Sequence, residues 1–132
     1  MADLLKFELV SPERLLSSGE VQQVVVPGTE GEFTVLANHA PVLATMKPGV
    51  VTVTDSSGSE DRIFVRGGFA EVNPGGLTIL AEEAIPVADL SSDRLAQQVR
   101  NAEEDVADSK DAEKKRRAQE TLDHLKQIQA VL

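Results

Sequence analysis

The sequence contains no cysteine, no tryptophan and no tyrosine. Without cysteine the chain cannot form disulfides, thiolate zinc sites or a cysteine nucleophile, which fits a reducing, intracellular compartment. Without tryptophan and tyrosine it has little with which to stack bases or sugar rings, and its formal net charge of −9 opposes binding to nucleic acid and to anionic lipid. We therefore expect no nucleic-acid ligand.

Signatures of membrane insertion and of common chemistries are also missing. No apolar run approaches the roughly 20 residues that span a bilayer, and the N-terminus shows no secretion-signal pattern, so we expect membrane association only through partners. The common nucleotide-binding, hydrolase and zinc-protease motifs are absent. The two histidines, His39 and His124, fall in different halves of the chain, so we expect no metal site and no cofactor.

What is present divides into two parts of different composition. All nine glycines lie at or before Gly76 and all six prolines at or before Pro86. Thirteen of the sixteen valines also precede residue 88. We place a domain boundary here and expect a first domain of residues 1–86 and a second of residues 87–132.

The first part has the pattern of short β-strands. Residues 6–10 and 77–81 alternate between apolar and polar, and residues 50–54 and 62–66 are rich in β-branched or aromatic side chains. Glycine- and proline-containing turn signals separate these runs. A single sheet of this size would leave an apolar face in water, so the pattern predicts eight to ten strands in two sheets packed face to face, or in a flattened barrel. We expect an antiparallel β-sandwich of about ten strands.

The second part has a helical period. Apolar residues recur at helical spacing twice, with a polar break at residues 107–111 and a capping serine, Ser91 or Ser92, before the first stripe. A short break between two helices predicts an antiparallel hairpin, and the overall fold class is α+β. The stripes comprise Leu95, Val99, Ala102 and Val106, then Ala118, Leu122, Leu125, Ile128 and Leu132. Because both are thin, we expect a hairpin of low stability that acts as a mobile arm.

Glu30 and Glu32 are the candidate acid/base pair. Residues i and i+2 of a strand share a face at about 6 to 7 Å, within the range that glycoside hydrolases use. The pair lies beside Gly28 and Gly31 in a predicted turn, however, where both carboxylates remain solvated and ionised. We discount catalysis, which leaves an ordinary acidic turn, favoured by the sequence alone, or a contact surface for another protein.

Two further features have a simple and a functional interpretation. His39, in the Asn38-His39-Ala40-Pro41 segment, is more often a hydrogen-bonded structural residue than a ligand. Four adjacent cations form the other feature, and they cover every side of one helical turn, so a solvated surface is the default. In an acidic protein they also suit an acidic partner segment. These cations are Lys114, Lys115, Arg116 and Arg117.

Two long stretches resemble one family. They are VPGTEGEFTVLANHAPVLATMKPGVV at residues 26–51 and FVRGGFAEVNPGGLTILAEEA at residues 64–84. The E-G-E loop, the N-H-x-P segment, the K-P-G turn, the G-G-F-x-E-V strand and the L-A-x-x-A end occur in order, followed by a two-helix tail. The chain thus resembles the epsilon subunit of F-type rotary ATP synthases, called delta in mitochondria, over essentially its whole length.

The resemblance implies a non-catalytic rotor subunit at the foot of the central stalk, between the gamma subunit and the membrane ring of c subunits. It assigns Glu30, Gly31 and Glu32 to contact with polar loops of the c-ring and His39 to the side that meets gamma. It also implies that the hairpin extends toward the catalytic beta and alpha subunits and inhibits ATP hydrolysis through residues 114–117. The implied location is the cytoplasmic face of the bacterial inner membrane, as a peripheral part of the complex.

One family motif is largely missing. Members that bind ATP carry [I/L]-D-x-x-R-A at the start of the first helix, whereas this chain reads Leu90-Ser-Ser-Asp-Arg94-Leu95. Only Leu90 and Arg94 match, so we do not expect nucleotide binding, and Arg94 is its only candidate. The alternative to a rotor subunit is a stand-alone sandwich that binds a ligand or acts as an adaptor, with the helices as a dimerising hairpin.

Overall fold

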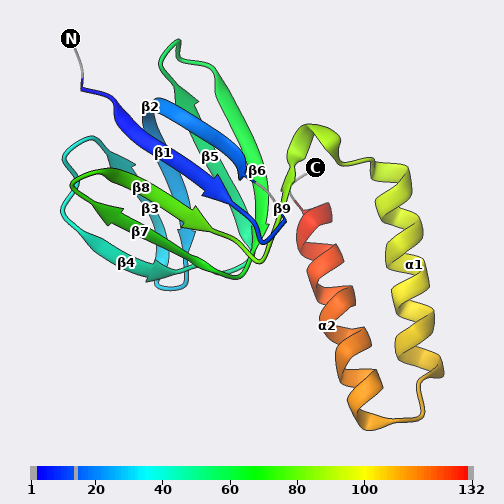
Figure 1. Ribbon diagram of the computed structural model, residues 1–132. Helices are drawn as coiled ribbons and strands as arrows, with labels where there is room; N and C mark the ends of the chain where they lie inside the picture. Colours follow the sequence, from blue (N-terminus) through cyan, green and yellow to red (C-terminus); the bar gives the residue numbers. More distant parts are fainter. Residues whose placement is uncertain (1–2, 14, 131–132) are drawn as a thin grey trace. The chain divides into compact units, whose positions relative to one another are not determined.

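The computed structural model of the protein describes residues 3–13 and 15–130. The chain forms two compact units that divide between Ala88 and Asp89, a β-unit and a helical unit (Figure 1). The predicted sandwich followed by a helical hairpin is confirmed. Within its described residues the β-unit has nine strands, where the sequence predicted about ten: β1 (Leu5–Val10), β2 (Leu15–Gly28), β3 (Gly31–Leu36), β4 (Val42–Thr45), β5 (Gly49–Asp55), β6 (Glu60–Arg66), β7 (Phe69–Asn73), β8 (Gly76–Leu80) and β9 (Glu83–Pro86).

The strands follow the order β4-β7-β8-β1-β2-β5-β6-β9, and β3 pairs with β2. All of these pairs are antiparallel except β1 with β8, which is parallel. The parallel pair joins segments about 70 residues apart, with Phe7 opposite Leu77. The prediction of a wholly antiparallel sandwich therefore missed this one pairing, because strand direction follows from chain topology and not from local pattern.

Strand β2 takes part in both layers of the sandwich. Its first half pairs with β1, and its second half pairs with β5 and β3. The register shifts between Val21 and Gln23, and such an irregularity bends a strand and lets it pass from one sheet to the other. In Figure 1, β4, β7, β8 and β1 accordingly lie side by side in one layer, with β3, β5 and β6 in the other.

The core lies between these layers and follows from period-2 alternation. Along β1, Leu5, Phe7 and Leu9 are buried while Lys6 and Glu8 are exposed. Branched aliphatic residues from the other strands complete the same cluster, among them Val24, Val26, Val35, Val51, Val53, Val65 and Ile79. Side chains of this shape pack densely on a pleated surface, so the sandwich is a well-filled and stiff body.

The helical unit contains α1 (Ser92–Asp108) and α2 (Ala112–Gln129), which pack along each other. A short 3-10 turn, Val87–Asp89, precedes α1. Ser91 caps α1, as predicted, and Asp111 caps α2 by accepting hydrogen bonds from the backbone of Glu113 and Lys114. Six residues of the predicted stripes are buried: Leu95, Val99 and Ala102 on α1, and Leu122, Leu125 and Ile128 on α2. Val106 and Ala118, also predicted, are only half-buried. Leu132, the last member of the second stripe, lies outside the described residues.

Candidate functional site

The acidic turn, residues 30–32, lies at a tight hairpin between β2 and β3. The strand β2 continues through Pro27 and Gly28 instead of breaking there, and a two-residue turn of Thr29 and Glu30 leads into β3 at Gly31. Gly31 has φ of 133°, a conformation that side chains rarely adopt. Glu30 lies in the turn and Glu32 in β3, both exposed, so the regular strand spacing considered for an acid/base pair does not apply to them. The turn presents two solvated carboxylates on a short, well-defined loop.

His39 lies in a second turn, between β3 and β4. Asn38 has φ of 66°, a left-handed conformation that asparagine tolerates, and the His39 amide donates to the Leu36 carbonyl at 3.2 Å. The His39 ring nitrogen Nδ1 lies 2.7 Å from the Ala40 carbonyl oxygen. Because a carbonyl only accepts, Nδ1 carries the proton in this contact and Nε2 faces away from it.

The structure brings the acidic turn and His39 to one surface. Glu30, Gly31 and His39 line an open hollow of about 460 Å³, whose other wall is the edge strand β4, whereas Glu32 is not among its lining residues. Glu30 and Gly31 stand on one side of this hollow, and His39, Val42 and Leu43 on the other. The two contacts that the resemblance assigned to different partners therefore lie next to each other.

An apolar row on the outer face of the sandwich was missed by the sequence reasoning. Phe69 and Leu80 lie opposite each other on β7 and β8, with exposed fractions of 39% and 40%. Leu43 on β4, 66% exposed, lies beside this row and opposite Glu71, since Thr45 is the β4 residue opposite Phe69. The parallel partner of Leu80 is Val10, and the partner of Val10 on β2 is Leu15, also exposed. Large apolar side chains in one cross-strand row on a solvent face are typical of a protein contact surface. Leu80 is the outward residue of an alternating run, which is the signal that could have revealed it.

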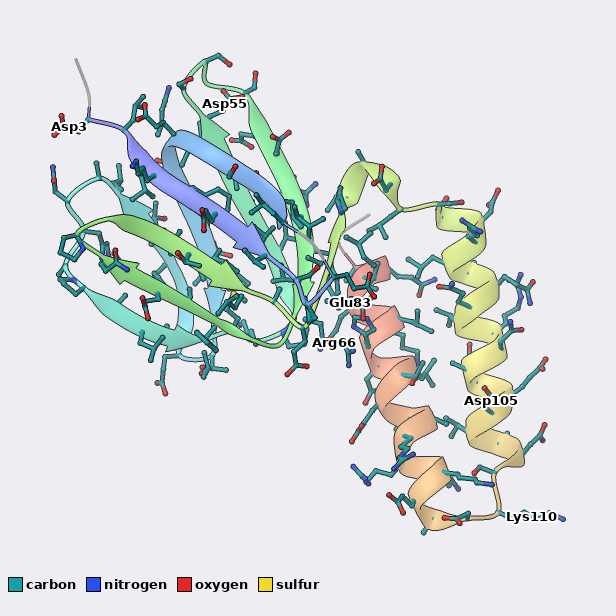
Figure 2. All side chains as sticks on the ribbon, viewed as in Figure 1. Asp3, Asp55, Arg66, Glu83, Asp105 and Lys110 are labelled. Atoms are coloured by element: carbon teal, nitrogen blue, oxygen red, sulfur yellow. The ribbon has the colours of Figure 1, made fainter. Side chains whose placement is uncertain are left out.

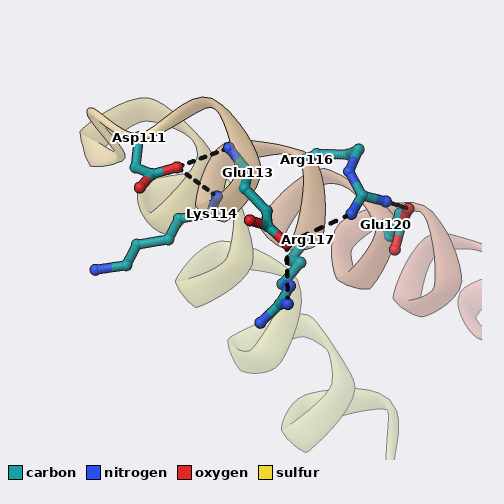
Figure 3. A network of polar contacts seen from close by, with 6 residues as sticks. All are labelled: Asp111, Glu113, Lys114, Arg116, Arg117 and Glu120. Carbon is teal, nitrogen blue, oxygen red and sulfur yellow. Dashed lines mark hydrogen bonds and ion pairs between the residues drawn. The ribbon is translucent and has the colours of Figure 1, made fainter.

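The basic cluster of residues 114–117 occupies the start of α2 (Figure 3). Arg116 contacts Glu120 at 2.8 Å, and Arg117 contacts Glu113 at 3.1 Å. Lys114 and Lys115 make no side-chain hydrogen bond or ion pair within the part of the chain that the structure describes. Two of the four cations are thus partly engaged by the same helix, and the two lysines remain available to a partner.

The charges at the hairpin tip are mixed with respect to the helix dipoles. The last turn of α1 has no basic residue and includes Asp105 and Asp108, near the end that favours cations. The start of α2 has the Asp111 cap and Glu113, which suit its positive end, followed by the basic cluster, which does not.

Arg94 stands in the first turn of α1. Its backbone amide donates to the Ser91 hydroxyl at 3.4 Å, and its side chain is exposed. Among the described residues, none extends the partial nucleotide motif, of which the sequence retains only Leu90 and Arg94. Among residues 3–13 and 15–130, no group of three or more His, Asp or Glu side chains is placed to hold a metal ion, and no helix is long and apolar enough to cross a bilayer.

The β5–β6 hairpin holds the side chain whose titration is most altered. Asp55, labelled in Figure 2, accepts hydrogen bonds at Oδ1 from the Ser57 hydroxyl (2.6 Å), the Ser57 amide (2.9 Å) and the Ser59 amide (3.0 Å). These donors, the Ser57 hydroxyl first, lower the pKa of Asp55 because they favour the ionised carboxylate. The arrangement is an Asx-type turn that fixes the hairpin, and its role is structural.

Comparison with known proteins links this architecture to one family. The family model described as ATP synthase, Delta/Epsilon chain, beta-sandwich domain matches residues 4–87. A protein of Parvibaculum lavamentivorans called ATP synthase epsilon chain is 52% identical over 128 residues, which cover 97% of each chain. The protein of the same name from Mesorhizobium japonicum is 51% identical over 132 residues, covering 100% of this chain and 98% of its own.

Chains in two solved ATP synthase structures have a similar fold. A chain in the cryo-EM structure of the Euglena gracilis mitochondrial ATP synthase, comprising OSCP, F1 and c-ring, superposes with a TM-score of 0.82 at 26% identity, covering 99% of this chain and 82% of that one. A chain from the central stalk and c-ring of the Tetrahymena thermophila mitochondrial ATP synthase has a TM-score of 0.68 at 12% identity, covering 96% and 94%, and shares the fold.

Proposed function

The chain belongs to the delta/epsilon chain family of ATP synthases, and we propose that it is a non-catalytic subunit of the central stalk that couples the c-ring to the gamma subunit. The observation that carries this proposal is the likeness to epsilon chains, at about half of all positions, over nearly the full length of both chains. The physical support is a stiff sandwich that exposes two different contact surfaces. A body of this kind transmits torque without doing chemistry.

The acidic turn is the proposed contact with the c-ring. Glu30 and Glu32 are exposed, and Gly31 fixes the loop between them. Carboxylates on a short turn form charge-assisted hydrogen bonds with basic or polar loops, and such pairs set the register of an interface more than its raw affinity. The c-ring loops that face the stalk are the proposed partner.

The apolar row is the proposed contact with the gamma subunit. Leu43, Phe69 and Leu80 supply the exposed apolar area that a stable interface needs, and His39 lies beside Leu43 at the rim of the hollow. The acidic turn and the apolar row are two surfaces of different chemistry on one small domain, so each can bind a different partner. The sandwich then acts as the connector between them.

The helical hairpin is the proposed regulator. Its basic cluster, with Lys114 and Lys115 available, suits an acidic segment of the catalytic beta and alpha subunits when the hairpin extends. Thin apolar stripes give the hairpin little packing energy, which keeps the packed and extended states close in free energy, as a switch requires. We propose no nucleotide or other cofactor for this arm, and Arg94 serves as a surface residue of α1.

The proposed location is peripheral, at the cytoplasmic face of a bacterial inner membrane, with attachment through gamma and the c-ring. Affinity purification of the tagged chain from native membranes tests this directly, because gamma and the c-ring should be recovered with it. Recovery of neither partner would overturn the assignment.

Coupling is tested by reversing the charge of the acidic turn. Membranes with Glu30→Lys and Glu32→Lys together should show weaker ATP-driven proton pumping at a given rate of ATP hydrolysis. The control is Glu60→Lys with Asp61→Lys, which makes the same charge change on β6, outside the turn. Normal pumping in the first double variant would remove the docking role of the turn.

Inhibition is tested by removing the arm from the assembled enzyme. Deletion of residues 89–132 cuts the chain at the division between its two units and should raise ATPase activity. An unchanged activity would leave only the coupling role.

A further inference from the structure

The acidic turn is clamped to the end of β4 by a pair of threonines. The Thr29 amide donates to the Thr45 carbonyl at 3.0 Å, and the Thr29 hydroxyl lies 3.1 Å from the same carbonyl. The two hydroxyl oxygens are only 2.6 Å apart. Thr29 is the residue directly before Glu30, so this contact fixes the base of the acidic turn.

The Thr29 hydroxyl has one proton and two acceptors within reach, the Thr45 carbonyl at 3.1 Å and the Thr45 hydroxyl at 2.6 Å. When it donates to the carbonyl, the Thr45 hydroxyl donates to the Thr29 oxygen, and the two bonds form a short chain that polarises both. In either arrangement the Thr29 hydroxyl takes part in every side-chain bond of the clamp, whereas the Thr45 hydroxyl takes part in one.

The neighbouring backbone supports the same junction. The Lys47 amide donates to the Pro27 carbonyl at 3.0 Å, and Gly28 forms an antiparallel bridge with Met46. These bonds align the β2–β3 hairpin with the end of β4. They act on Pro27 and Gly28, which precede the acidic turn in the chain. The threonine pair instead holds Thr29 itself, the residue next to Glu30 in the chain.

Thr45 also belongs to the apolar surface. It lies opposite Phe69 in the β4–β7 pair, and Phe69 lies opposite Leu80 in the next pair. Thr45 therefore contacts Thr29, at the base of the acidic turn, through its hydroxyl. Its position in β4 places it next to Phe69, at the end of the apolar row. Thr45 thus connects the two proposed contact surfaces.

We propose that Thr29 and Thr45 are positioning residues, which hold the acidic turn in the orientation that a basic or polar loop of the c-ring recognises and join it to the strand edge that meets gamma. This inference rests on the proposed function of the turn. A turn that is ordered before binding loses less conformational freedom on binding, so the clamp raises affinity without touching the partner. It also gives force a path from the turn into the sheet through hydrogen bonds with little freedom to move.

The geometry predicts a ranking of variants. Thr29→Val removes both side-chain bonds, whereas Thr45→Val removes one and leaves the Thr29 hydroxyl on the carbonyl. Valine keeps the size and branching of threonine, so the packing is preserved. Thr29→Val should therefore have the larger effect, and the double variant should be no worse than Thr29→Val alone.

The experiment measures binding of the purified complex of full-length chain and gamma to a purified c-ring in nanodiscs. Thr29→Val should weaken binding about 3- to 10-fold, as expected for the loss of one to two neutral hydrogen bonds, and Thr45→Val should weaken it less. Thr29→Ser should restore binding to within about 2-fold, because serine keeps the hydroxyl. The matched control is Thr34→Val, on exposed β3, whose hydroxyl has no hydrogen-bond partner among the described residues.

Three results would count against the clamp: wild-type binding by Thr29→Val, failure of Thr29→Ser to restore binding, or an equal loss in Thr34→Val. If Thr29→Val unfolds by circular dichroism, Thr45→Val and Thr29→Ser carry the test, since each retains at least one bond. The Glu30→Lys, Glu32→Lys variant distinguishes the docking role of the acidic turn from the positioning role of the threonine clamp. Unchanged binding in that variant overturns the proposed role of the turn, whereas weakened binding there with no effect of Thr29→Val overturns only the clamp.

Discussion

Phe69 and Leu80 face each other across the antiparallel pair of β7 and β8, and both side chains point to solvent. The residues that follow Phe69 and precede Leu80, Ala70 and Ile79, are fully buried in the core. The pair thus belongs to the alternation of a two-layer sandwich, with an apolar residue on its outer face where a polar one is usual. This outer position makes the pair accessible to a partner and to substitution without repacking the core.

Phe69→Glu should weaken binding of gamma at least about 10-fold, because it places a charge in the desolvated centre of an apolar interface. Isothermal titration of the purified chain with purified gamma measures this. Leu36→Glu is the matched control, since Leu36 is also a large exposed apolar residue but lies at the end of β3, away from the row. Equal losses in both variants would show that the apolar row has no special role.

Gly68→Ala should destabilise the sandwich by about 3 kcal/mol or more, from backbone strain together with overlap. Its φ is 88°, and an added Cβ would overlap the carbonyl oxygen of Leu80. Gly58→Ala is the control, because φ is 91° there but the Cβ would meet nothing within 4 Å, so only the strain of about 1 to 2 kcal/mol remains. Urea denaturation of both variants separates the two costs, and equal midpoints would contradict the steric argument.

Asp55→Asn should change how stability depends on pH. The pKa of Asp55 is lowered in the folded state, so its contribution is present above the usual carboxyl range and is lost as pH falls through the lowered pKa. The variant should melt below the wild type at pH 7, and this gap should narrow below about pH 4. Thermal melts at pH 7 and pH 3 measure it.

Asp61→Asn is the control for removing a carboxylate from this hairpin. Asp61 lies on the same β5–β6 hairpin and accepts none of the hydrogen bonds that Asp55 accepts. A gap between wild type and Asp55→Asn that stays constant from pH 7 to pH 3 would argue against the role of the ionised carboxylate.

Lys114→Glu should stabilise the isolated hairpin and weaken inhibition of the assembled enzyme. Lys114 is the third residue of α2 after the Asp111 cap, where an acidic side chain favours the helix, and the gain is about 0.3 to 1 kcal/mol. Lys126→Glu, in the last turn of α2, should have the opposite effect on stability. Thermal circular dichroism and ATPase assays check the two readouts, and stabilisation with unchanged ATPase activity would exclude Lys114 from the inhibitory contact.

Local features of this protein were determined by the sequence itself. The buried face of β1 follows from alternation at Leu5, Phe7 and Leu9, and the start of α1 follows from the cap Ser91. The composition changes where glycine and proline stop, after Pro86, and the two compact units divide between Ala88 and Asp89. These features depend on neighbours in the chain, so pattern and capping chemistry suffice to predict them.

Only the tertiary structure decided which distant segments meet. The parallel pairing of β1 with β8 joins residues 70 positions apart, such as Phe7 and Leu77, and the row from Leu15 to Phe69 depends on it. The hydroxyl contact joins Thr29 and Thr45 across 16 positions. Alternation says that a residue faces outward, but not which outward residues become neighbours. That depends on strand order and register, which the packing of the whole core selects.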